Sequence, residues 1–231
     1  MGFRSVFMNI KDNLLRIKEA LPQHVTLVAV SKTKSNEEIM EAYQTGQRVF
    51  GENKVQEMVE KWEHLPKDIE WHMIGHLQRN KVKYIASFVS LIHGVDSFKL
   101  LKEINKQALK ADRVISCLLQ VHIAEEDTKF GMDASELNDL VNGKEFKELN
   151  AVKVVGLMGM ATFTEDTKVV ENEFNHLNSI FESLKNTYPR TDNFELSIRS
   201  MGMSGDYNIA IQCGSTMVRI GSHIFGSRNY N

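Results

Sequence analysis

Apolar and polar positions follow two periods along this chain, and the two periods alternate. From residue 3 to residue 21, apolar residues recur every three or four positions, which is the spacing of an amphipathic helix. A nearly continuous apolar run rich in β-branched residues follows at 25–30, as in a strand buried on both faces. Helical spacing returns at 36–45 and stops at Gly46.

The alternation continues to the C-terminus and predicts the fold class. Further strands are expected at 48–50, 70–74, 89–93, 114–122, 152–158, 194–198 and 216–220. Helices are expected between them at 55–62, 81–88, 98–109, 135–141, 170–184 and 207–211. Strict alternation implies a parallel sheet, and eight strands in this length fit a closed barrel better than an open sheet. We therefore expect one α/β domain over residues 1–231, a single (β/α)8 TIM barrel with an extra N-terminal helix.

Composition excludes several classes of protein and partner. The chain of 231 residues is 42% hydrophobic and 25% charged, as in ordinary soluble domains. Its net charge of −2 gives no reason to expect nucleic acid or a membrane as partner. It has no signal-peptide core, and Cys117 and Cys213 form no CxxC pair. We expect a cytoplasmic monomer with reduced thiols.

The first candidate residue for chemistry is Lys32, in Ser31-Lys32-Thr33 after the first strand. Active sites of such barrels lie at the C-terminal ends of the strands, so this lysine is expected at the barrel mouth. Partial burial favours the neutral amine that a Schiff base requires. Considered alone, the more common role of such a lysine is a solvated or ion-paired charge.

Two glycine- and serine-containing segments, 200–206 and 219–226, follow the last two strands. This is the usual phosphate site of such barrels, where Gly221 permits close backbone approach and Ser204 and Ser222 offer hydroxyls. The alternative is a pair of tight turns in which Ser204 or Asp206 caps a helix.

A lysine and a phosphate site together point to a phosphorylated aldehyde, of which pyridoxal 5′-phosphate (PLP) is the common example. Arg219 lies two residues before Gly221 and could contact the pyridine nitrogen. A guanidinium keeps its proton, so that nitrogen would stay unprotonated and the ring would be a poor electron sink. The alternative for Arg219 is a structural ion pair within the barrel.

Other polar residues near the predicted mouth carry weaker signals. Asn53 with Gln56 resembles a helix-capping box. His72 and His76 are four residues apart, but no glutamate lies beside His72, so HExxH does not apply and no metal is expected. Lys129 follows the fifth strand and is more typical of a solvated loop charge.

Several motifs together resemble the pyridoxal phosphate homeostasis proteins (the YggS/PROSC family), in order from about residue 25 to residue 230. They are AVSKT at 29–33, FGEN at 50–53 with Gln56-Glu57, IGHLQ at 74–78 with Asn80-Lys81, SMGMS at 200–204 with Asp206, GSTMVRIG at 214–221 and IFG at 224–226.

The resemblance implies a barrel like the N-terminal domain of alanine racemase and PLP bound to Lys32. It places the phosphate near Ser204, Gly221 and Ser222, and Arg219 beside the ring nitrogen. The pocket would be lined by Asn53, His76 and Met203. Thr128-Lys129 departs from the Ser-Lys-Ser-Gly sequence common in the family, and Arg199 is an added positive charge that lies either near the phosphate or on the surface.

The resemblance implies a PLP-binding protein of vitamin B6 homeostasis without established catalysis, with PLP-dependent apoenzymes as candidate recipients. The main alternative is a PLP-dependent amino-acid racemase, which needs two bases. The chain ends about ten residues after the last strand, so we expect no second domain like that of alanine racemase. An aldolase using Lys32 would need a proton-transfer partner, and no acidic pair is evident in the sequence.

Overall fold

Eight parallel strands form a closed barrel in the computed structural model, which describes residues 9–124 and 130–226. The strand order follows the chain, and the last strand pairs with the first. The strands are β1 (Thr26–Val30), β2 (Val49–Glu52), β3 (Glu70–Met73), β4 (Leu91–Val95), β5 (Ile115–Gln120), β6 (Val152–Met158), β7 (Phe194–Met203) and β8 (Met217–Ile220). The predicted (β/α)8 barrel is confirmed.

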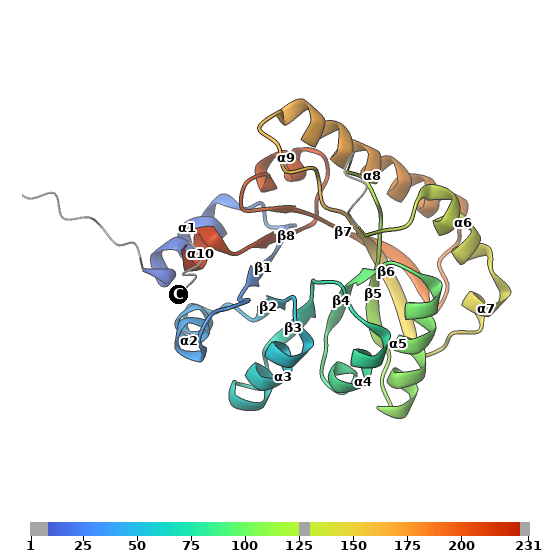
Figure 1. The fold of residues 1–231 in the computed structure, drawn as a ribbon. Helices are drawn as coiled ribbons and strands as arrows, with labels where there is room; N and C mark the ends of the chain where they lie inside the picture. Colours follow the sequence, from blue (N-terminus) through green and yellow to red (C-terminus); the bar gives the residue numbers. More distant parts are fainter. Residues whose placement is uncertain (1–8, 125–129, 227–231) are drawn as a thin grey trace, which may run out of the picture.

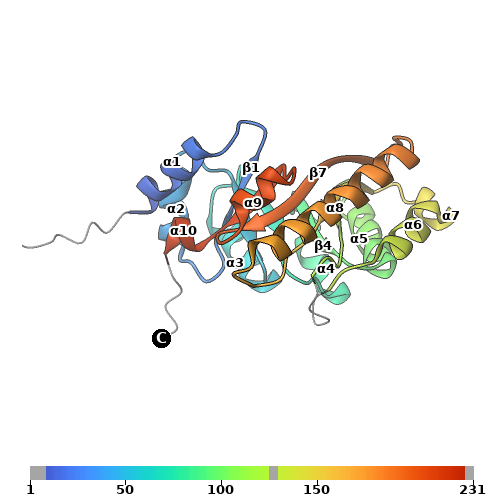
Figure 2. The ribbon, with the colours of Figure 1, turned by 90° about the horizontal axis from the view of Figure 1, so that it is seen from above.

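Helices surround the strands (Figure 1). They are α1 (Ile10–Ala20), α2 (Asn36–Gln44), α3 (Val55–His64), α4 (Val82–Ile85), α5 (Phe98–Lys110), α6 (Ala134–Asn142), α7 (Lys144–Lys147), α8 (Thr167–Thr187), α9 (Tyr207–Gln212) and α10 (Ser222–Phe225), with a 3-10 turn η1 (Arg79–Lys81). Helix α1 lies beside α10 in both views (Figures 1 and 2), where Asn13 Nδ2 donates to Ile224 O at 3.1 Å. The extra N-terminal helix therefore packs against α10, the last helix of the described chain. Residues 3–8 of the predicted helix lie outside the described part.

Side chains cap some helix N-termini but not the one at which the sequence suggested a capping box. Ser35 and Glu38 form a capping box at α2, so two otherwise unbonded amides are satisfied. Helix α3 instead begins after Lys54, which makes no side-chain capping hydrogen bond. The expected capping role of Asn53 with Gln56 is therefore wrong.

Strand β7 is longer than predicted, because it runs to Met203 instead of ending at residue 198. Ser200 pairs with Met217 and Met203 pairs with Arg219 on β8. Gly202 has φ of 98°, and a Cβ there would lie 2.7 Å from Ala210 Cβ, so glycine is required where this end of the strand passes α9. Pairing with β8 supplies hydrogen-bonding partners for this end of β7, and the periodicity of the sequence does not reveal them.

The core is divided between the two faces of the barrel wall. Leu27 and Ala29 belong to the large cluster between strands and helices, whereas Val28 belongs to a separate small cluster. This alternation is that of a strand with two buried faces. The small cluster consists of Val28, Leu91, Leu118, Met158 and Met217. None of the helices in residues 9–124 and 130–226 is both long and apolar enough to span a membrane.

Candidate functional site

A cavity of about 670 Å³ lies at the C-terminal ends of the strands. It is lined by all eight residues that the sequence analysis assigned to a PLP site: Lys32, Asn53, His76, Met203, Ser204, Arg219, Gly221 and Ser222. Sequence reasoning missed other parts of its wall, including Gln120, Phe130 and the segment 161–164. Phe130 and Phe163 are largely exposed. From the sequence alone, an exposed phenylalanine at a cavity cannot be told from one buried in the core.

Lys32 lies just beyond β1 in a tight, unusual turn. Ser31 is fully buried, and Thr33 has φ of 65°, a left-handed conformation that costs a β-branched residue on the order of 1–2 kcal/mol. Such strain persists only where surrounding contacts hold it. The backbone that presents Lys32 is therefore strongly constrained.

A largely buried ionic cluster lies between the ends of β1 and β2 and helix α3. It consists of Ser31, Glu52, Glu57 and Lys61. Lys61 Nζ donates to Glu52 Oε1 at 2.8 Å and to Glu57 Oε1 at 2.7 Å, and Ser31 Oγ donates to Glu52 Oε1 at 2.5 Å. Burial raises the pKa of Glu52 to about 7, although Lys61 and Ser31 favour its ionised form.

The loops after β7 and β8 meet at the cavity. Ser204 Oγ accepts a hydrogen bond from the Gly221 amide at 3.2 Å. Helix α10 starts at Ser222, and its backbone hydrogen bonds begin with the amide of Ile224. Asp206 precedes α9 without a side-chain capping bond, and its Oδ1 accepts from the Met203 amide at 2.5 Å, so the capping alternative does not describe this loop.

Arg219 is buried at the inner side of the cavity. Its Nη1 donates to Ser200 O at 2.8 Å and to Ser200 Oγ at 2.6 Å, and its Nη2 donates to Gly159 O at 3.0 Å. Within the described residues it forms no ion pair, so the structural ion-pair alternative is not observed. Burial lowers the pKa of Arg219 to about 10. This value is still well above neutral pH, so the guanidinium stays charged.

A chain of polar side chains extends from Arg219 through the barrel interior. This imidazole chain consists of Arg219, Ser200, His93 and His72. Ser200 Oγ lies 3.0 Å from His93 Nδ1, and His93 Nε2 lies 3.0 Å from His72 Nδ1. Burial lowers the pKa of both histidines, to about 3 for His72, and the charge on Arg219 lowers that of His93 further, so both rings are neutral at pH 7.

The four-residue spacing of His72 and His76 suggested a possible pair, but in the structure the two side chains lie in different places. His72 is inside the barrel, whereas His76 lies at the cavity rim, with Nδ1 3.1 Å from Asp96 Oδ2 and its ring stacked on Phe130. Within the described ranges, no three His, Cys, Asp or Glu side chains are grouped to hold a metal ion. The signal that could have revealed the imidazole chain is His93, a polar residue inside an otherwise apolar strand.

Two other basic residues were considered from the sequence. Arg199 lies against α8, where Nη1 donates to Asn178 Oδ1 and Glu182 Oε1 at 2.9 and 2.7 Å, so its charge is neutralised there and not at the phosphate-type loops. Lys129 lies outside the described residues. Cys117 and Cys213 are both buried.

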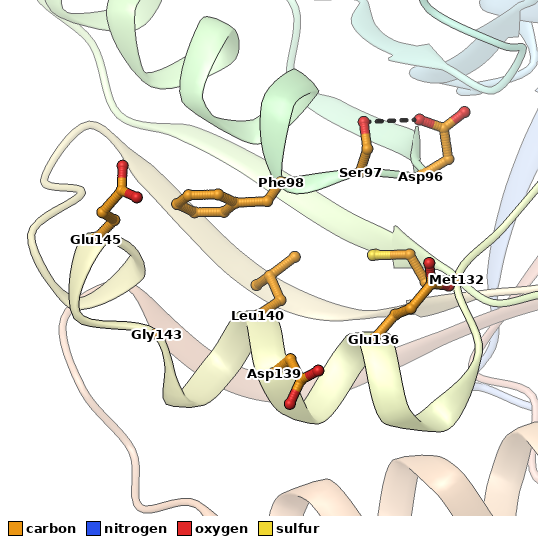
Figure 3. A pocket seen from close by; sticks show the side chains of 9 residues that line it. All are labelled: Asp96, Ser97, Phe98, Met132, Glu136, Asp139, Leu140, Gly143 and Glu145. Carbon is orange, nitrogen blue, oxygen red and sulfur yellow. Dashed lines mark hydrogen bonds between the residues drawn. The ribbon is translucent and has the colours of Figure 1, made fainter.

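A second cavity, of about 450 Å³, has the opposite electrostatic character (Figure 3). Phe98 and Leu140 lie toward its middle, and none of its lining residues in the described chain is cationic. Four carboxylates line it: Asp96, Glu136, Asp139 and Glu145. Like charges repel, so this cavity disfavours a phosphate group, and the cavity at the barrel mouth is the candidate anion site.

Comparison with known proteins agrees with this geometry. The family model described as "Alanine racemase, N-terminal domain" matches residues 7–229. A pyridoxal phosphate homeostasis protein of Pasteurella multocida is 40% identical, over 97% of this chain and 100% of the relative. Its counterpart in Aquifex aeolicus is 42% identical, over 88% of this chain and 87% of the relative. The chain belongs to the pyridoxal phosphate homeostasis protein family.

Solved structures similar to this homeostasis-family protein include a relative with PLP bound and more distant racemases. PipY of Synechococcus elongatus, whose structure has PLP bound, superposes with a TM-score of 0.85 at 33% identity, covering 94% of this chain and 100% of PipY. Alanine racemase of Clostridium difficile has a TM-score of 0.78 at 13% identity, covering 96% of this chain but 60% of the racemase. That likeness shows the barrel fold alone.

Proposed function

We propose that this homeostasis-family protein binds PLP at the barrel mouth, holds it as a Schiff base on Lys32, and acts in intracellular vitamin B6 homeostasis without catalytic turnover. The observation that carries the proposal is the single cavity that brings together Lys32, the two phosphate-type loops and Arg219. The names of the relatives and the PLP bound to PipY support the same ligand.

The lining residues fit the chemical groups of PLP. Ser204, Gly221 and Ser222 offer hydroxyl and amide donors to the phosphate. Three hydrogen bonds occupy three of the five N–H donors of Arg219, and within the described residues no bond uses its Nε. That guanidinium would donate to the pyridine nitrogen and keep the nitrogen unprotonated.

The covalent step needs no oxidant or reductant. In its neutral form the amine of Lys32 would add to the aldehyde carbon, and both amine hydrogens would leave with the aldehyde oxygen as one water when the C=N bond forms. Addition of water reverses the step and releases the cofactor, with the amine restored. The same site can therefore store and release PLP.

Lys32→Ala tests the proposal by absorption spectroscopy and mass spectrometry. PLP added to the unaltered protein should give the absorption band of a Schiff base, and borohydride reduction should label the peptide containing Lys32. Lys32→Ala should lose both signals. Lys34→Ala is a matched control, because Lys34 lines the same cavity but bonds Glu38 Oε1 and Phe225 O at 3.2 and 3.0 Å. An unaltered protein without the band, or an undiminished band in Lys32→Ala, would refute the proposal.

An amino-acid racemase is the second candidate, and one observation favours it. His76 with Asp96 places a histidine–carboxylate pair at the rim of the cavity that contains Lys32, so two proton-transfer groups share one site. Against it, Arg219 disfavours a protonated ring nitrogen. Chiral analysis after incubation with an amino-acid panel separates the two, since sustained turnover would replace a carrier with an enzyme.

We also infer PLP-dependent apoenzymes as recipients, a monomeric state and a cytoplasmic location. Two buried free thiols support a reducing compartment. Analytical ultracentrifugation tests the monomer. Activation of a PLP-free enzyme across a size-exclusion membrane, compared with direct mixing, tests whether transfer requires contact.

A further inference from the structure

Both peptide groups that flank the Cα of Lys32 are bonded to one ion pair from α3. On the preceding side, the carbonyl oxygen of Ser31 accepts from Lys61 Nζ at 2.8 Å. On the following side, the amide of Thr33 donates to Glu57 Oε1 at 2.5 Å. Lys61 and Glu57 bond each other at 2.7 Å, so the two anchors form one unit.

The ammonium group of Lys61 is saturated by these contacts. A lysine has three N–H donors, and its acceptors here are Ser31 O, Glu52 Oε1 and Glu57 Oε1. Its side chain is 6% exposed, so charge-assisted bonds are poorly screened by solvent. Lys61 and Glu57 are outside the set of residues that line the mouth cavity, so neither serves the cofactor directly.

These bonds hold a backbone that has an intrinsic tendency to relax. Thr33 adopts φ of 65°, which a β-branched residue avoids unless other contacts impose it. The Thr33 amide bond to Glu57 acts on that residue itself. Loss of the anchor would let the turn relax and change the direction in which Lys32 presents its amine.

We propose that Lys61 and Glu57 are positioning residues for the Schiff base: they fix both peptide planes beside Lys32, so that its amine meets the aldehyde of a phosphate-anchored ligand. The inference rests on the proposed function, because it concerns the same lysine and ligand. It predicts that the pair matters for the covalent bond and much less for the phosphate and ring contacts.

The test compares PLP with pyridoxamine 5′-phosphate, which has the same phosphate and ring but no aldehyde. In Lys61→Met and Glu57→Ala, apparent PLP affinity from the Schiff-base absorption should fall at least tenfold. Binding of pyridoxamine 5′-phosphate, measured by calorimetry, should change less than threefold. Glu57→Gln keeps an oxygen acceptor for the Thr33 amide and should retain most of the PLP affinity.

A second readout needs no ligand. Hydrogen exchange of the Thr33 amide should be at least tenfold faster in Glu57→Ala than in the unaltered protein or in Glu57→Gln. Lys153→Met is the control for removing a paired lysine elsewhere, since Lys153 pairs with Glu195 on strands β6 and β7. Glu57 is partly exposed, so its variants test the idea even where Lys61→Met fails to fold.

The outcomes are separable. Equal losses for both ligands, or unchanged PLP affinity in Glu57→Ala, would overturn the positioning role and leave the proposed function intact. An unaltered protein that forms no Schiff base with PLP would overturn the proposed function, and the positioning role with it.

Discussion

The ionic cluster and the imidazole chain are both buried beneath the barrel mouth, but they satisfy their polar atoms in different ways. The ionic cluster lies outside the barrel wall, under Lys32, and combines one ammonium with two carboxylates. The imidazole chain lies inside the wall, where two neutral rings bond each other directly and one hydroxyl joins them to Arg219. Each buried cation bonds a backbone carbonyl, but Lys61 is balanced by two carboxylates, whereas the hydrogen bonds of Arg219 within the described residues go to uncharged acceptors.

The two clusters also respond to acid in opposite directions. The folded-state pKa of Glu52 is raised from 4.5 to about 7, so the folded protein binds a proton more tightly there, and that contribution to stability is lost as pH rises from 4.5 to 7. The folded-state pKa of His72 is lowered from 6.5 to about 3, so its contribution is present above pH 6.5 and is lost as pH falls toward 3. His93 changes in the same direction as His72.

The largest expected effect comes from breaking the ionic cluster. Lys61→Met leaves Glu52 buried without its cation, which should lower the free energy of unfolding by about 3–5 kcal/mol at pH 8. Urea denaturation measures this loss. The control Lys153→Met removes a more exposed pair and should cost less than about 1 kcal/mol. Equal losses in the two variants would mean that burial does not distinguish these pairs.

Breaking the imidazole chain at its centre should have a smaller effect. His93→Leu leaves the buried His72 Nδ1 without its partner and removes one of the two partners of Ser200 Oγ, which keeps its bond from Arg219, and this should cost about 2–3 kcal/mol at pH 7.5. The loss should shrink by roughly 1–2 kcal/mol at pH 5, because the variant lacks a histidine that is protonated only on unfolding. If the stability difference between the two proteins instead grew as the pH fell, His93 would not be neutral in the folded protein.

The pH response of Glu52 is tested by Glu52→Gln. Relative to this variant, the unaltered protein should lose about 2 kcal/mol of stability as pH rises from 5 to 8, since the amide of the variant does not titrate. Denaturation curves at several pH values give the difference between the two proteins. Parallel pH profiles would show that Glu52 stays ionised throughout this range.

The smallest effect is expected at the hydroxyl that joins Arg219 to the imidazoles. Ser200→Ala removes one acceptor from Arg219 and the partner of His93 Nδ1, but it leaves the bond of Arg219 to the Ser200 carbonyl, so about 1–2 kcal/mol of stability should be lost. Thermal denaturation measures this change. A loss as large as that of His93→Leu would show that the chain acts as one unit instead of as separate bonds.

The order of secondary structure and most of the candidate site followed from local pattern. Alternating periodicity located all eight strands, because a strand buried on both faces is a short apolar run and a covering helix has one apolar stripe. Lys32 and the loops near Ser204 and Gly221 were found because barrel sites follow strand ends. The family motifs added Asn53, His76 and Met203, which line the same cavity.

Other features depended on contacts between distant segments. The extension of β7 to Met203 arises from pairing with β8, and the ionic cluster joins Ser31, Glu52 and Lys61 from separate elements. His72 and His76 are near in sequence, yet they belong to different environments, because barrel closure buries one and leaves the other at the rim. Periodicity reports which face of an element is apolar, and so it predicted elements and strand ends. Which polar atoms meet across the barrel was decided by closure, since hydrogen bonds require ångström-scale placement of residues far apart in the chain.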